Sequence, residues 1–204
     1  MSELRLFIPE KKEVYERFRE KLMSRISKGE DKEYLFIAKV MNTSNADYDT
    51  VLERVEWINA NYSTRMPEGD RKVIANYISG RSDFDAALDE DGYSLVDDLR
   101  KCGTSKKHFS FATKYCHHCR PNKYPIYDAL NMRVLAIYYG YRDKYNQEPD
   151  SKLISYREYC SCHDLFRSDF VNRKPADYAD DEGFYIDKFI QAMGGAKEIR
   201  DLLF

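Results

Sequence analysis

The sequence predicts an all-α fold of about eight to ten helices, and three observations favour this class. Apolar residues recur every three or four positions through nearly all of the 204 residues, which is the spacing of one helix face. No alternating apolar and polar segment runs longer than about four residues. Apolar residues make up 43% of the chain and aromatic residues 14%, so it can bury a core as one domain or two small lobes.

Capping and breaking residues delimit the helices of the first half. Pro9 suits a first turn, Gly29 ends the first helix, Asp47 can cap the third, and Gly80 closes the fourth. Residues 62–69 interrupt the helical spacing between the third and fourth helices. The helices predicted before residue 100 lie near residues 14–26, 34–41, 48–61, 73–80, 84–88 and 94–99.

The second half follows the same pattern around proline punctuation. Ser105 opens a helix that reaches Cys116, and Pro121 and Pro125 bracket a rigid connector. A long helix then has to end before Pro149. The helices predicted after the connector lie near residues 130–141, 156–170 and 184–193.

Composition excludes several classes of protein. The formal net charge of −2 provides no global attraction to nucleic acid or to an anionic membrane. No apolar run approaches the roughly 18 residues of a membrane span, so no membrane partner is expected. Five cysteines and a charged start without an export signal predict the cytoplasm. We find no phosphate loop, dinucleotide glycine pattern or serine elbow, and therefore expect no cofactor.

Charge is segregated along the middle of the chain. Residues 82–99 contain seven acids and no Lys or Arg, whereas residues 100–127 contain seven bases and no acid. Aromatic residues interleave the basic segment, a mixture that can pair phosphates and stack bases. The alternative is that the two segments neutralise each other as solvated faces, or form one docking surface.

Two segments together resemble the helix-hairpin-helix DNA glycosylases of the endonuclease III superfamily. Residues 57–65, W-I-N-A-N-Y-S-T-R, resemble the helix that reads L-L-S-A-Q-T-T-D in that superfamily. Residues 110–135 contain S-F-A-T-K-Y-C and then Y-P-I-Y-D, and resemble its T-A-x-x-h-L…P-h-V-D-T-H segment. Their order and separation match the superfamily, and the resemblance covers roughly residues 50–140.

The resemblance implies a two-lobed helical domain, with an inner lobe near residues 43–125 and an outer lobe of residues 1–42 plus 126–204. It implies that Asp128 is the catalytic carboxylate, with Arg133 at or near a basic position one turn later. Two features depart from the superfamily: residues 101–107 keep only Gly103 of the hairpin L-P-G-V-G, and no lysine aligns with the nucleophile of the bifunctional members. The four-cysteine iron–sulphur spacing is also absent, so a monofunctional or inactive member is expected.

The expected partner is duplex DNA, which basic and aromatic side chains would contact. The predicted nucleic-acid-binding residues are Asn61, Tyr62, Arg65, Lys106, Lys107, His108, Lys114, Lys123, Tyr124 and Tyr127. Each has a structural alternative. Asp128 could simply cap a helix, Lys114 could pair with Asp128, and residues 62–65 could be ordinary packing at a helix end.

Cysteine and histidine cluster twice, and this inventory could hold zinc. The candidate ligands are Cys116, Cys119, Cys160, Cys162 and His163. The alternative is that the cysteines are small buried hydrophobic residues, which the apolar helix face at Cys116 favours.

Three functions follow from these observations. The first is a DNA glycosylase that extrudes a nucleotide and hydrolyses the base–sugar bond with Asp128. The second is a catalytically inactive nucleic-acid or nucleotide-binding module, in phage defence or a mobile element. The third is a protein-interaction module that docks through its acidic and basic segments.

Overall fold

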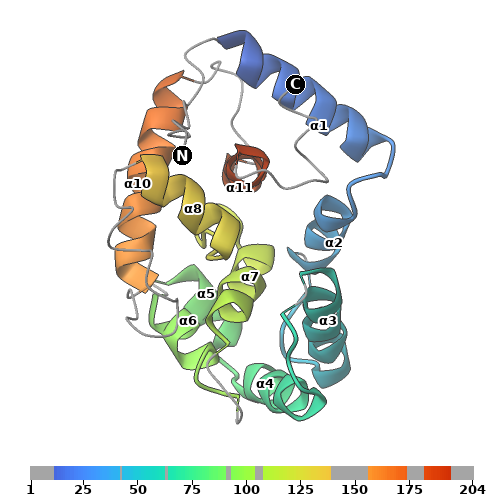
Figure 1. The fold of residues 1–204 in the computed structure, drawn as a ribbon. Coiled ribbons are helices and arrows are strands. Elements are labelled where there is room, and N and C mark those ends of the chain that lie inside the picture. The colour runs from blue at the N-terminus through green and yellow to red at the C-terminus, as the bar shows by residue number, and fades with distance from the viewer. Residues whose placement is uncertain are drawn as a thin grey trace. The chain divides into compact units, whose positions relative to one another are not determined.

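The computed structural model describes residues 12–41, 43–62, 64–90, 93–103, 108–138, 156–173 and 182–193. Every regular element in these ranges is an α-helix, which confirms the all-α prediction (Figure 1). None of these helices is at once long enough and apolar enough to cross a membrane.

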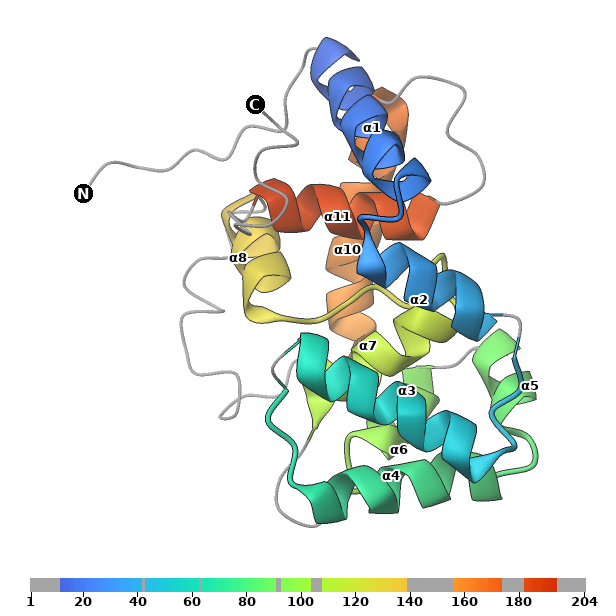
Figure 2. The same cartoon turned by 90° about the vertical axis from the view of Figure 1, so that its right-hand side faces the viewer.

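The helices occur where the apolar spacing predicts them. Their bounds are α1 Lys12–Ser27, α2 Lys32–Met41, α3 Tyr48–Asn61, α4 Glu68–Gly80, α5 Phe84–Asp89, α6 Tyr93–Leu99, α7 Phe109–Cys119, α8 Ala129–Tyr138, α10 Tyr156–Arg173 and α11 Glu182–Met193 (Figure 2). The cap predicted for α3 forms, because the Asp47 carboxylate accepts a hydrogen bond from the Thr50 backbone N–H at 2.8 Å.

The chain divides into two compact units. The terminal unit combines Met1–Lys32 with Tyr127–Phe204, and the central unit is Glu33–Ile126. The first boundary differs from the predicted lobes, which divide after residue 42, because α2 from Glu33 onward packs with the central unit. Ring contacts of Phe36 in α2 with Trp57 and His118 account for this placement.

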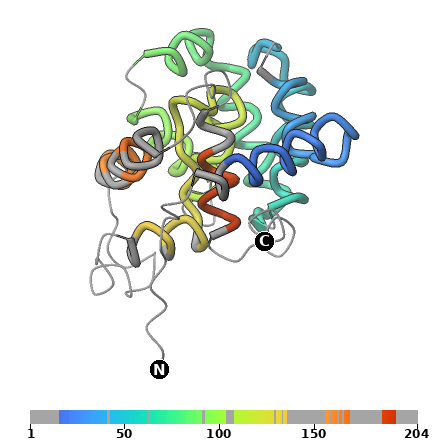
Figure 3. Tube along the Cα trace, turned by 90° about the horizontal axis from the view of Figure 1, so that it is seen from above, coloured from blue at the N-terminus to red at the C-terminus, as the bar shows by residue number. Residues whose placement is uncertain are grey.

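In the terminal unit, aromatic side chains join the helices. Phe18 of α1 packs edge-on against Phe189 of α11, with ring centroids 5.2 Å apart and both side chains buried. Helix α8 contacts α10 and α11, and it lies beside α11 in the trace of Figure 3. The described core of this unit includes Phe18, Leu22, Val134, Phe166 and Ile190, which are buried.

In the central unit, α7 is the innermost helix. Its residues 111–119 are all buried, and it contacts α3 on one side and α6 on another. Helix α3 packs along α4 through apolar side chains of both helices, with Val55, Ile58, Ile74 and Ile78 buried. A helix that is buried on every side needs apolar side chains, or internal partners for its polar ones. Helix α7 contains buried side chains of both kinds.

A buried amide joins the helices of the central unit. Asn45 Oδ1 accepts hydrogen bonds from Arg54 Nη1 of α3 at 2.6 Å and from the Tyr115 hydroxyl of α7 at 2.6 Å. Its backbone N–H and its amide donate to the Asp85 carboxylate of α5. Arg54 also donates to the Thr43 carbonyl at 3.0 Å. One side chain therefore fixes the approach of α3, α5 and α7 to the loop before α3.

We predict that Asn45→Ala lowers the free energy of unfolding by about 3 kcal/mol, because it removes the acceptor of Arg54 Nη1 and of the buried Tyr115 hydroxyl. Urea unfolding followed by circular dichroism measures the loss. Asn76→Ala, at an exposed position of α4, is the matched control and should change stability by less than about 0.5 kcal/mol. Equal effects of the two substitutions would contradict a central role for Asn45.

Asp85 should make the stability of the protein sensitive to acid. Burial raises the pKa of Asp85. Hydrogen bonds from Asn45 and Ser44 and the charge of Arg120 lower it by a larger amount, so the pKa lies below the ordinary 3.8. A carboxyl with a lowered folded-state pKa contributes stability above its unfolded pKa, and this contribution is lost as pH falls through the folded value. We predict that Asp85→Asn shows a shallower loss of unfolding free energy below pH 4 (about the ordinary carboxyl pKa) than the unmodified protein. Urea titrations at stepwise lower pH measure both slopes, and parallel slopes would contradict this assignment.

Candidate functional site

Asp128 is the N-cap of α8 in the terminal unit. Its Oδ1 accepts hydrogen bonds from the backbone N–H groups of Leu130 and Asn131, each at 2.9 Å, and its carbonyl accepts from Met132 N–H at 2.9 Å. Its side chain is half-buried. The capping alternative is therefore observed, and it is compatible with a reactive role because a cap holds the carboxylate in one orientation. The side chain of Arg133 lies outside the described residues.

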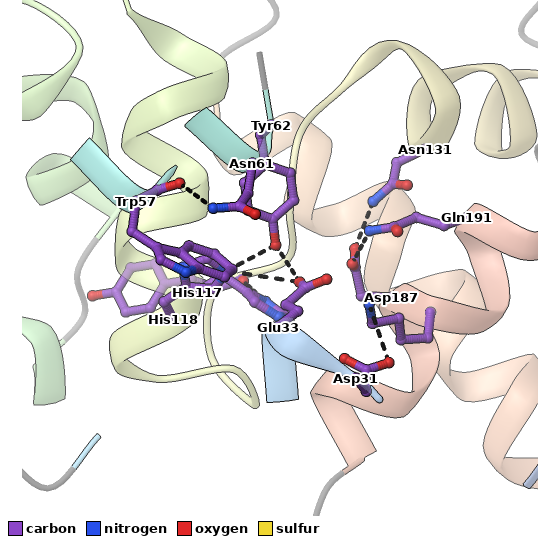
Figure 4. Close-up of polar contacts among 12 residues, drawn as sticks. Asp31, Glu33, Trp57, Asn61, Tyr62, His117, His118, Asn131, Asp187 and Gln191 are labelled. Atoms are coloured by element: carbon purple, nitrogen blue, oxygen red, sulfur yellow. Dashed lines mark hydrogen bonds and ion pairs between the residues drawn. The ribbon is translucent and has the colours of Figure 1, made fainter. Parts of the chain in front are cut away.

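A buried polar network continues from this cap. Asn131 donates its amide to Asp187 Oδ1 of α11 at 2.7 Å, and Gln191 donates to the other carboxylate oxygen (Figure 4). Burial, followed by the carboxylates of Asp128 and Asp187, raises the pKa of the Tyr159 phenol, and a hydrogen bond with Asn131 partly opposes this effect. The first turn of α8 thus brings two carboxylates and a protonated phenol near one another within the terminal unit.

A short connection joins two helices of the central unit. Helices α6 and α7 are joined by residues 100–108, and the His108 backbone N–H donates to the Arg100 carbonyl at 3.0 Å to close the connection. Residues 104–107, and with them Lys106 and Lys107, lie outside the described part of the chain.

A buried hydrogen bond joins this connection to α4. His108 Nε2 lies 2.6 Å from Asp70 Oδ2 of α4, and both side chains are almost completely buried. Gly103 lies against this pair, because a Cβ there would approach His108 Cδ2 to 2.5 Å and Asp70 Oδ2 to 3.1 Å. The glycine is therefore required by the close approach of the imidazole ring.

A second polar cluster surrounds Tyr62, at the end of α3. The Tyr62 hydroxyl contacts a Glu33 carboxylate oxygen and lies 2.9 Å from His118 Nε2 (Figure 4). Lys114 Nζ lies 5.1 Å from the centre of the Tyr62 ring, and it donates to Ser110 Oγ at 2.7 Å. All five residues belong to the central unit.

The structure corrects the prediction for three nucleic-acid-binding residues, which are buried. His108 pairs with Asp70, as described above, and Lys114 is 3% exposed. Tyr124 is 1% exposed and donates its hydroxyl to the Leu88 carbonyl at 3.1 Å. Their polar atoms serve contacts inside the unit, which sequence reasoning missed because the burial of each residue depends on segments distant in the sequence.

The other predicted contacts that the structure describes are accessible. Asn61 and Arg65 are exposed, whereas Tyr62, Lys123 and Tyr127 are half-buried. Arg65 has a φ of 54°, in the left-handed region that a non-glycine residue rarely adopts. The Asn59 side chain holds the loop on both sides of it, by accepting from Thr64 Oγ1 at 2.8 Å and from Met66 N–H at 2.9 Å. An exposed arginine in a constrained loop is a feature of binding sites as well as of turns.

The acidic and basic segments partly neutralise each other within the central unit. Arg120 makes a two-point contact with Asp89, including 2.9 Å between Nη2 and Oδ2. Arg100 pairs with Asp97 at 3.1 Å, one helical turn earlier. These pairs support the alternative reading of the charge runs, in which opposite charges meet locally, and leave less positive charge for DNA.

The described cysteines of the zinc candidate set are packed in the cores. Cys116 and Cys119 are buried in α7, and burial raises the pKa of both thiols, that of Cys119 to about 11. In the terminal unit Cys160 and His163 are buried on α10, and the side chain of Cys162 lies outside the described residues. A neutral thiol in an apolar environment behaves as a small hydrophobic residue, as the alternative reading has it.

Four polar residues of these networks were missed by sequence reasoning. They are Glu33, Asn45, Asp70 and Asp187. The one available signal is at residue 187, where an acid interrupts the apolar face of a predicted helix. The others occupy ordinary polar positions, and only their long-range partners distinguish them.

The protein has an all-α fold, and the Asp128 carboxylate caps one of its helices. The chain belongs to the family described as "HI_0787_N: N-terminal domain", which matches residues 12–123. It is 33% identical over 114 residues to an uncharacterized protein of Haemophilus influenzae, an alignment that covers 54% of this chain and 55% of that protein. The chain thus spans about half the length of this curated relative. No solved structure matches it.

We predict that Gly103→Ala lowers the free energy of unfolding by about 2 kcal/mol, because the added methyl group forces the buried His108 ring to move. Thermal and urea unfolding measure the loss. Gly69→Ala is the matched control. No atom lies within 4 Å of a Cβ there, so it should leave stability unchanged or raise it by up to about 1 kcal/mol. Similar melting curves for the two variants would contradict the close packing of Gly103 against the His108 ring.

Proposed function

We propose that the protein is a monofunctional DNA glycosylase of the helix-hairpin-helix type, acting in the cytoplasm on a base flipped out of duplex DNA. The observation that carries the proposal is the order of elements around Asp128. A hairpin between α6 and α7 is followed by a proline connector and by a helix whose N-cap is this carboxylate. That order is the one implied by the resemblance of residues 57–65 and 110–135 to this superfamily.

In the proposed reaction, Asp128 stabilises positive charge on the sugar. As the N-glycosidic bond breaks, C1′ becomes cationic, water adds to it, and the departing base takes up a proton. A carboxylate held by two backbone N–H groups does not have to reorient when this charge develops, which is the condition for effective electrostatic stabilisation. The half-buried position of the side chain supports this role, because partial exclusion of water strengthens the interaction.

Contacts with DNA would come from the hairpin and from the loop after α3. The exposed side chain of Lys101 lies at the end of α6, and Arg65 projects from a constrained loop. Lys106 and Lys107 complete the proposed phosphate-binding set. A protein with few phosphate contacts binds with a modest salt dependence, in keeping with a formal net charge of −2.

Asp128→Asn tests the proposal with little structural disturbance, because Asn caps a helix as well as Asp does. We predict a fall of at least about 100-fold in single-turnover base release from duplexes carrying damaged or modified bases, with duplex binding retained. Asp47→Asn is the matched control, since Asp47 caps α3 in the same way, and it should leave the rate unchanged. Base release that survives Asp128→Asn would remove the mechanism.

A second candidate function is a non-catalytic module that binds nucleic acid or nucleotides. The observation that favours it is the cap itself, which accounts for an aspartate at this position without any chemistry. Such a module would bind DNA in a salt-dependent manner and release no base from any duplex. The same assay therefore separates the two functions.

A further inference from the structure

The Tyr62 cluster combines an acceptor, an aromatic surface and a fixed hydrogen-bond direction. Glu33, at the start of α2, contacts the Tyr62 hydroxyl, and His118 Nε2 lies 2.9 Å from the same oxygen and 3.7 Å from Glu33 Oε1. A carboxylate only accepts, so the Tyr62 hydroxyl donates to Glu33, and His118 Nε2–H donates to the Tyr62 oxygen. Tyr62 and His118 therefore hold the Glu33 carboxylate in one orientation.

The cluster is bounded by stacked aromatic rings. Trp57 lies parallel to Phe36 with ring centroids 3.9 Å apart, and it meets Tyr62 and His118 in edge-to-face contacts with centroids 6.2 Å and 5.6 Å away. Phe36 and His118 are buried, whereas Trp57 and Tyr62 are half-buried. Partly accessible rings beside a fixed polar group form a surface on which a planar base can stack.

The charges beside the rings define which base suits this surface. A carboxylate accepts hydrogen bonds from several donors at once, so Glu33 can accept from an amino group as well as from Tyr62. Adenine, cytosine and guanine carry an exocyclic amino group, whereas thymine carries none. The Lys114 ammonium on the Tyr62 ring, 5.1 Å from its centre, offsets the charge of the carboxylate and restrains the ring.

We propose that Glu33, Trp57 and Tyr62 form a recognition site for a nucleobase that carries an exocyclic amino group. Trp57 and Tyr62 provide the stacking surface, Glu33 accepts from the amino group, and His118 fixes the Tyr62 hydroxyl that orients Glu33. The inference rests on the proposed function for the ligand being a nucleobase. It adds that the protein recognises the base through its exocyclic amino group. It involves the central unit only and requires no turnover.

Intrinsic fluorescence tests this site directly, because Trp57 is the only tryptophan of the chain. The full-length protein is titrated with dGMP, dAMP, dCMP and dTMP, and with deoxyribose 5-phosphate as the control for the sugar phosphate. We expect a saturable change with the three amino-bearing nucleotides at concentrations at least about fivefold below that needed for dTMP, since the two carbonyl oxygens that flank the N3–H of thymine repel the carboxylate. No saturable change with any nucleotide, or equal affinity for dCMP and dTMP, would overturn the proposal.

A matched pair of variants locates the effect. Glu33→Gln should weaken dCMP binding about tenfold and remove the preference over dTMP. Glu53→Gln, at an exposed glutamate of α3, should change neither. A preference that persists in folded Glu33→Gln would overturn the assignment. If Glu33→Gln does not fold, the comparison of dCMP with dTMP in the unmodified protein still decides the matter.

The two proposals fail separately. Nucleotide binding without base release would remove the glycosylase mechanism and leave this site intact. Base release without an amino-dependent fluorescence change would leave the mechanism and overturn this site.

Discussion

The hydrogen bonds of one buried amide underlie the arrangement of the central unit. Asn45 accepts from Arg54 and Tyr115 and donates to Asp85, so three helices are positioned by a single side chain in the loop before α3. The guanidinium of Arg54 is buried, and a buried charge without its partners is strongly destabilising. Since α7 carries His118 of the Tyr62 cluster, that cluster depends on the same amide for its geometry.

A second buried interaction holds the connection between α6 and α7. The His108 ring is hydrogen-bonded to Asp70 of α4, and separating the two would leave a buried polar group without its partner, so the bond favours one arrangement. Gly103 makes room for the imidazole ring and so lets the backbone of the α6–α7 connection lie close to α4.

The fold leaves less positive charge accessible for nucleic-acid binding than the charge pattern of the sequence predicts. The basic segment suggests a long positive surface, yet Arg120 and Arg100 meet acids of the neighbouring segment, and Lys114 is buried. Any interaction with DNA therefore depends on a few placed side chains and on base contacts more than on overall charge. The Tyr62 cluster, in which a carboxylate faces aromatic rings, is consistent with recognition of a base rather than of a phosphate.

The sequence by itself determined what depends on near neighbours. Apolar residues at a spacing of three or four predicted the helices, and the caps at Asp47 and Asp128 could be predicted because a cap bonds only to the next two or three residues. The candidate carboxylate and its helix were therefore identified without coordinates.

Only the tertiary structure decided which of the polar residues meet. Glu33 and Tyr62 are 29 positions apart, Asp70 and His108 are 38 apart, and Asn131 and Asp187 are 56 apart. Such contacts depend on how whole helices pack, and their sequence spacing carries no signal. For the same reason the burial of α7 on every side could not be predicted from its own residues, because the helices that cover it lie elsewhere in the chain.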